Sequence, residues 1–118
     1  MVNIQTNFYT KNFTFEYVVE QKEVLKVIYE TLDEINLELD DGKKIDKSHN
    51  TSLYGGSGIL DSFELVNFVV LLEEKIDDEL HKIISLTDEK AISQKNSPFR
   101  TIASLENYII FLLEDNTN

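Results

Sequence analysis

The sequence predicts an all-α protein. Its 118 residues contain only four glycines and one proline, and the long segments between them carry hydrophobic residues at helical spacing. A β fold of this size would need turn residues between many short strands. Hydrophobic residues make up 42% of the chain, which is enough for a globular core. We therefore expect one helical domain, because the length fits a single unit.

The first helix is expected over residues 17–39. Hydrophobic residues recur there at alternating spacings of three and four, with acidic and basic residues on the opposite face, as in an amphipathic helix. The hydrophobic positions are Leu25, Ile28, Leu32, Ile35 and Leu39. Gly42 follows two aspartates and is placed to end the helix in a left-handed conformation.

Residues 1–16 form an N-terminal extension to a helical domain of residues 17–118. Phe13, Phe15 and Tyr17 alternate with polar residues, which is typical of a short strand. Two interpretations stay open. The extension is either a loosely packed segment, or one that packs its aromatic side chains onto the domain or a partner.

A long connection, residues 43–60, follows the first helix and is rich in turn formers. Loops of this length in small domains are uncommon and often functional. Four hydrophobic residues are expected to hold it against the core: Ile45, Leu53, Ile59 and Leu60.

The second helix is expected over residues 62–79. Asp61 and Glu64 have the spacing of a capping box, with aspartate in place of the usual serine or threonine. The inward stripe is Leu65, Val69, Leu72, Ile76 and Leu80. Much of the remaining surface is acidic.

The last part of the chain is expected to hold a short helical turn, beginning near Thr87, and a final helix over residues 104–114. Ser97 and Pro98 suit a helix N-cap and the first helical position. The hydrophobic residues expected to be buried are Ile83, Ile84, Leu86, Leu105, Ile109 and either Leu112 or Leu113.

Charge and composition exclude several functions. A net charge of −11 repels phosphate backbones, so we expect no nucleic-acid binding and attraction to basic protein surfaces instead. The chain has no cysteine, and its two histidines, His49 and His81, are far apart in sequence. We therefore expect no metal site and no catalytic residues. We expect no signal peptide, because residues 1–7 lack a basic region followed by an apolar run. No apolar run reaches about 20 residues, which favours a cytoplasmic protein without a membrane span.

Ser62 is the principal candidate for a functional residue. It follows Asp61 at the start of the second helix, just after the run Gly55-Gly56-Ser57-Gly58. A phosphodiester on a serine at a helix N-terminus is favoured by the free N–H groups and the helix dipole. Glycines would let a modifying enzyme approach closely, and Asp61 could help bind a metal carried by its nucleotide substrate. The alternative is that Asp61 and Ser62 only cap the helix.

The chain resembles the acyl carrier protein family over residues 20–114. The resemblance rests on Gly58-Ile59-Leu60-Asp61-Ser62-Phe63, on the acidic helix after it and on residues 99–109. It implies a four-helix bundle with a long loop between helices 1 and 2 and a short third helix. It also implies a 4′-phosphopantetheine arm on Ser62, taken from coenzyme A by a phosphopantetheinyl transferase. The arm would carry an acyl or aminoacyl group as a thioester.

The resemblance further implies that the acidic helix docks on partner enzymes, a loading ligase and a downstream acyltransferase or synthase. The implied partner-binding residues are Glu64, Leu71, Glu73, Glu74, Asp77 and Asp78. Such a carrier is expected to be a monomer and not an enzyme. Phe63 replaces the family's common leucine and the chain is longer than a minimal carrier, which favours a specialised biosynthetic pathway. The alternative function is an unmodified acidic helical protein-interaction module.

Overall fold

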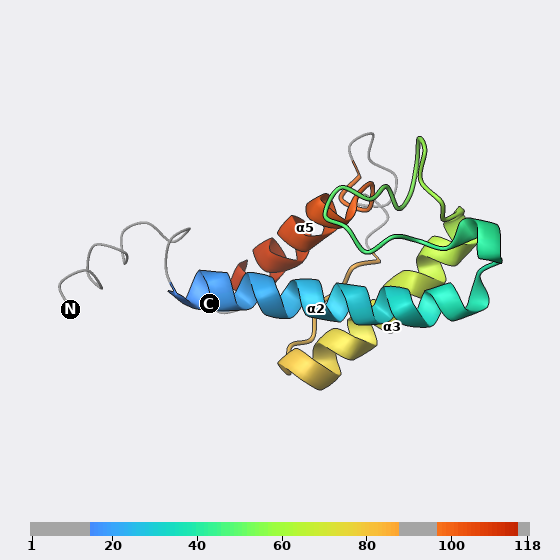
Figure 1. Ribbon diagram of the computed structural model, residues 1–118. Coiled ribbons are helices and arrows are strands. Elements are labelled where there is room, and N and C mark those ends of the chain that lie inside the picture. The colour runs from blue at the N-terminus through green and yellow to red at the C-terminus, as the bar shows by residue number, and fades with distance from the viewer. Residues whose placement is uncertain (1–14, 88–96, 116–118) are drawn as a thin grey trace.

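The described residues of the computed structural model, 15–87 and 97–115, are predominantly helical (Figure 1). In chain order they form α2 (Phe15–Glu38), the 3₁₀ turn η2 (Asp41–Lys43), α3 (Ser62–Leu80) and α5 (Ile102–Asp115). They contain no strand, only two isolated bridges, so the all-α prediction is confirmed for this part of the chain. The described ranges contain three α-helices. The predicted four-helix bundle is therefore not confirmed. The short helical turn expected from Thr87 falls mainly on residues 88–96, outside the described residues, and residues 97–101, just before α5, form a turn and not a helix.

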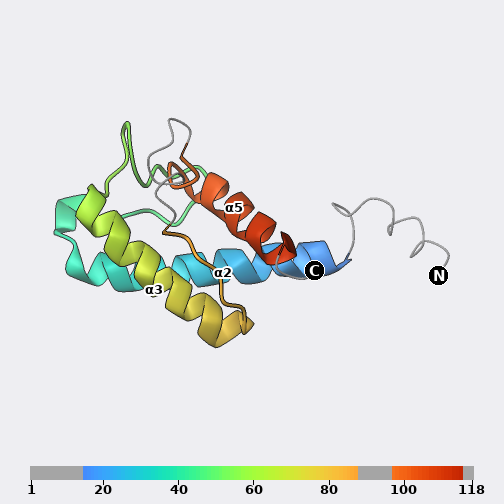
Figure 2. The same ribbon diagram turned by 180° about the vertical axis from the view of Figure 1, so that it is seen from behind.

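Helix α2 is the element against which the other two helices pack. Helix α3 crosses behind α2 in Figure 1 and in front of it in Figure 2, while α5 runs above α2 in both views and descends toward it at the C-terminal end. The buried residues Val24, Ile28, Leu32 and Ile35 share one side of α2, in keeping with its amphipathic sequence.

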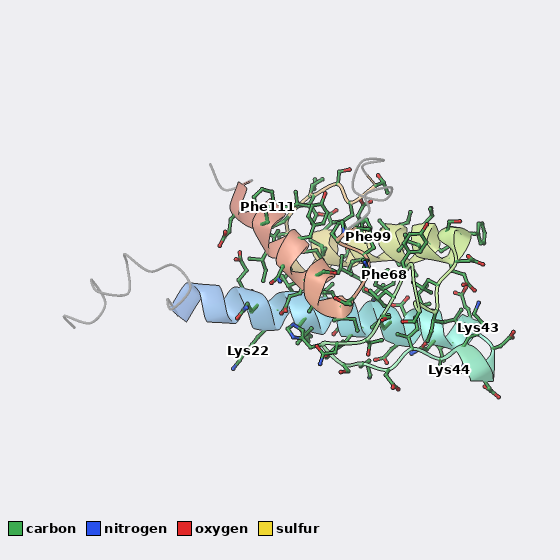
Figure 3. The ribbon with its side chains drawn as sticks, turned by 90° about the horizontal axis from the view of Figure 1, so that it is seen from above. Lys22, Lys43, Lys44, Phe68, Phe99 and Phe111 are labelled. Atoms are coloured by element: carbon green, nitrogen blue, oxygen red, sulfur yellow. The ribbon has the colours of Figure 1, made fainter. Side chains whose placement is uncertain are left out.

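The core is built from the predicted hydrophobic stripes, with several additions. In α3, the predicted positions Leu65, Val69, Leu72 and Ile76 are fully buried, while Leu80 is half-buried. The largest buried side chains are Phe68 and Phe99, which point between the helices (Figure 3). The buried hydrophobic residues outside the predicted set are Val24, Val27, Phe68, Phe99, Ile102 and Ile110.

Helix α2 begins at Phe15, two residues before its predicted start. Phe15 and Tyr17 therefore lie in a helix, and the strand-like interpretation is wrong for them. The preceding residues, 1–14, are outside the described part of the chain.

The C-terminal end of α2 is capped by a lysine and not by a left-handed glycine. Among the described glycines only Gly55 and Gly56 have positive φ, so the prediction for Gly42 is wrong. Instead, the Lys44 ammonium donates hydrogen bonds to the main-chain carbonyls of Asn36 and Leu39 at the end of the helix. A cation there also complements the helix dipole.

The connection between α2 and α3 is held by hydrogen bonds at both ends. The Asn36 side chain donates to the Ile45 carbonyl at 2.9 Å and accepts from the Ile45 N–H at 2.7 Å. Further along, Leu53 N–H donates to the Arg100 carbonyl at 2.7 Å, which ties the loop to the segment before α5. Ile45, Leu53 and Leu60 are buried as predicted, and Ile59 is half-buried.

The segment after α3 and the start of α5 differ in part from the predictions. Ile84 and Leu86 are buried as predicted, but Ile83 is 83% exposed, so that prediction is wrong. Helix α5 begins at Ile102, two residues before its predicted start, and Ser97 and Pro98 precede it in a turn. The Thr101 hydroxyl, which accepts from Ser104 N–H at 3.0 Å, caps the helix in place of Ser97.

Candidate functional site

Ser62 is the first residue of α3, and its side chain is exposed. The residue before it, Asp61, has an extended backbone and is the N-cap. Its carboxylate accepts from Glu64 N–H at 2.8 Å, and the Glu64 carboxylate accepts from Asp61 N–H at 2.9 Å. The predicted capping box is therefore confirmed, and it is completed without the Ser62 hydroxyl.

A lysine from η2 strengthens this helix start. Lys43 Nζ lies 3.0 Å from both carboxylate oxygens of Glu64, and Figure 3 places Lys43 at the far end of α2 from Lys22. The N–H of Asp61, and then Lys43, lower the pKa of Glu64, while the hydrogen bond to Glu64 raises the pKa of Lys43. Both groups therefore keep their charge, and Glu64 joins the end of α2 to the start of α3.

The glycine-rich run before Ser62 is a closed turn. Gly58 N–H donates to the Gly55 carbonyl at 2.8 Å, and Leu60 N–H donates to the Leu53 carbonyl at 2.8 Å. A Cβ on Gly58 would lie 2.5 Å from Tyr54 N, so no larger residue fits there without movement of the backbone. The turn thus fixes the position at which the chain enters the cap of α3.

A hollow of about 220 Å³ lies beside the start of α3. Its walls come from the C-terminal end of α2 and from the cap and first turns of α3: Ile35, Glu38, Leu39, Asp61, Phe63, Glu64 and Asn67. The lining is mixed, with three hydrophobic side chains among carboxylates and one amide.

An apolar stripe leads along the exposed face of α3 away from Ser62. Phe63, Val66 and Val70 are 74%, 44% and 43% exposed, and their spacing of three and four places them on one face of the helix. Sequence reasoning singled out Phe63 only as a departure from the family pattern and missed the two valines. The signal was available, because the three residues form a second hydrophobic repeat beside the buried one.

The six predicted partner-binding residues do not form one uniform surface. Glu74, Asp77 and Asp78 are exposed on α3. Glu73 is half-buried and accepts from Leu86 N–H at 2.5 Å, so it holds the segment after α3. Leu71 is half-buried against the core, and Glu64 is engaged by the cap and by Lys43.

His49 and Glu106 form an interaction that the sequence did not indicate. His49 Nε2 lies 2.5 Å from Glu106 Oε1, and the Glu106 side chain is only 5% exposed. A hollow of about 240 Å³ borders the pair, with Gln21, Lys22 and Leu25 of α2 as its other walls. The two residues are 57 positions apart, so only the folded chain brings them together.

Residues 15–87 and 97–115 contain no group of three or more histidine or acidic side chains able to hold a metal ion. Within the same ranges, none of the helices combines the length and the apolar character that crossing a bilayer requires. Comparisons with protein-family models, curated proteins and solved structures return no match for this chain.

Proposed function

We propose that this chain is an acyl carrier protein with its 4′-phosphopantetheine arm on Ser62. The observation that carries the proposal is the division of roles at the start of α3. Asp61 caps the helix through its carboxylate, while the Ser62 hydroxyl is exposed and takes no part in the capping box. A serine kept only for capping would occupy the N-cap position itself.

The electrostatics around Ser62 suit a phosphodiester. A group on the first residue of a helix lies next to unpaired N–H groups and to the positive end of the helix dipole. The nearby carboxylate of Glu64 is compensated by Lys43, whose Nζ lies 3.0 Å from both of its oxygens. The negative charge of a neighbouring carboxylate therefore opposes modification less than it otherwise would.

The surface beside Ser62 suits docking on basic enzymes. The apolar stripe of Phe63, Val66 and Val70 starts next to the serine, and the exposed carboxylates of Glu74 and Asp77 follow further along α3. An apolar centre with a charged rim is typical of protein interfaces. The expected partners are a phosphopantetheinyl transferase, an acyl- or aminoacyl-loading ligase and a downstream acyltransferase or synthase in a specialised pathway.

The protein would supply attachment and recognition, while the chemistry would belong to the arm and the partner enzymes. A tether also raises the concentration of its cargo at a docked enzyme. Cysteine is absent from the chain, so the thiol of the arm would be the only one present.

Mass spectrometry of the protein isolated from the cells that make it, before and after treatment with hydroxylamine, tests this function. Wild-type protein should carry an added mass, part of which hydroxylamine releases, because hydroxylamine cleaves thioesters. Ser62→Ala should carry neither the arm nor the releasable group, while Ser57→Ala, changed at another exposed serine nearby, should match wild type. A releasable acyl group on Ser62→Ala would overturn the proposal. An unmodified wild-type protein that still binds partners would favour the interaction module.

A further inference from the structure

Two glutamates from different helices face each other where the C-terminal end of α3 meets α2. Lys26 Nζ lies 3.4 Å from Glu30 Oε2 on its own helix and 3.7 Å from Glu79 Oε1 on α3. The two carboxylates thus contact the same ammonium group from different helices. One ammonium group therefore lies between two carboxylates that repel each other when both are ionised.

One oxygen of this pair lacks a donor. Glu30 Oε1 is buried, and no described residue donates a hydrogen bond to it. A buried acceptor without a partner is costly. A proton on Glu79 would turn that carboxyl group into a donor toward Glu30 and would remove the repulsion at the same time.

The pKa values of Glu30 and Glu79 shift in opposite directions. The hydrogen bond with Glu30 raises the pKa of Glu79, and burial and the charge of Glu30 act in the same direction. The hydrogen bond from Glu79 lowers the pKa of Glu30, helped by Lys26. When the two carboxylates bind one proton between them, that proton therefore resides mainly on Glu79.

The other charged groups at this contact come from both helices. Lys26 of α2 lowers the pKa of both carboxyl groups, and Lys75 of α3 acts on both in the same direction. Lys75 is itself ion-paired with Glu34 of α2. Three acidic and two basic side chains thus meet here, so the cluster keeps a negative charge until one carboxylate binds a proton.

We propose that Glu30 and Glu79 form a proton-sharing clasp, which holds the C-terminal end of α3 against α2 more firmly in mildly acidic solution than at neutral pH. Because the folded protein binds the Glu79 proton at a higher pH than the unfolded chain does, this group adds stability as the pH falls through its folded pKa. Protonation of Glu30 would lower the stability of the folded protein. This happens only at lower pH, because the pKa of Glu30 is lowered.

Urea unfolding of three proteins at pH about 7 and about 5 tests the clasp. This interval lies above the ordinary glutamate pKa, so a glutamate that binds a proton within it must have a raised pKa. The proteins are wild type, Glu79→Gln and the control Glu23→Gln, which removes an exposed carboxylate of α2. Glutamine can donate to Glu30 at any pH. Acidification should therefore raise the free energy of unfolding more in wild type and Glu23→Gln than in Glu79→Gln. Equal changes in all three proteins would overturn the proposal.

Carboxyl-carbon NMR titration of the wild-type protein gives a second test that needs no variant. Glu79 should titrate at a higher pH than Glu30. Titration of both groups at the same pH would contradict the clasp, whatever the stability of the variants.

Discussion

Lys43 holds both carboxylate oxygens of Glu64 at 3.0 Å, and so connects the turn after α2 to the first turn of α3. The same carboxylate accepts the Asp61 N–H at 2.9 Å, so one side chain closes the capping box and joins two elements. Ser62 lies between the two residues of that box. The arrangement fixes the backbone on either side of the serine without using its hydroxyl.

Glu64→Gln should destabilise the protein at neutral pH and much less in acid. The pKa of Glu64 is lowered in the folded state, so its contribution is present above the ordinary glutamate pKa and is lost as the pH falls through the folded pKa. Urea unfolding of wild type and variant at pH about 7 and about 3 measures the difference. An equal difference at both pH values would contradict a charge-dependent role for Glu64.

Asp61→Ala and Ser62→Ala should differ in stability although they are neighbours. Loss of the Asp61 cap should cost about 1 kcal/mol, because the N–H of Glu64 loses its acceptor. Ser62→Ala should change the free energy of unfolding by less than about 0.5 kcal/mol, as for an ordinary surface substitution. Asp61→Ser, which keeps a capping oxygen, should recover most of the loss. A cost for Ser62→Ala as large as that for Asp61→Ala would assign the serine a structural role.

Gly58→Ala should destabilise the turn before Ser62. The new Cβ would lie 2.5 Å from Tyr54 N and 2.6 Å from the Leu53 carbonyl carbon, and neither backbone atom can move alone. The expected cost is about 2 kcal/mol, as for other overpacked sites. Gly42→Ala is the matched control, because nothing lies within 4 Å of its added Cβ. Chemical denaturation of both variants makes the comparison, and equal stabilities would contradict the tight turn.

Polar substitution of the apolar stripe should weaken partner binding and leave the fold intact. Val66→Asn and Val70→Asn change side chains that are 44% and 43% exposed, so little burial is lost on folding. If the stripe is the docking centre, each variant should bind a loading enzyme about tenfold more weakly. Leu37→Asn is the control, since Leu37 is 84% exposed but lies on α2. Similar losses in all three variants would argue against a specific surface on α3.

The helices and much of the core were predictable from the sequence because they depend on local periodicity. The repeat Leu65, Val69, Leu72 and Ile76 is buried as predicted, and the spacing of Asp61 and Glu64 identified the capping box. The end of α2 was not predictable in the same way. Lys44, which caps it, lies after the 3₁₀ turn and donates back to the carbonyls of Asn36 and Leu39. The position of a glycine after the helix does not indicate such a contact.

The candidate surface was harder to predict, because charge alone does not tell whether a carboxylate is engaged. Glu64 and Glu73 look like exposed docking residues in the sequence, yet Lys43 binds the first and Leu86 N–H binds the second. The contact of His49 with Glu106 likewise depends on how the long connection folds over α5. Such partners follow from tertiary packing, not from the residue types.

Intact-protein mass spectrometry after incubation with coenzyme A, magnesium and a broad-specificity phosphopantetheinyl transferase tests whether Ser62 accepts the arm. Wild-type protein should gain the mass of one phosphopantetheine, peptide analysis should place the gain on Ser62, and Ser62→Ala should gain nothing. A folded wild-type protein that stays unmodified with this enzyme and with the transferase of its own cells would contradict a carrier function at Ser62, as would modification of Ser62→Ala.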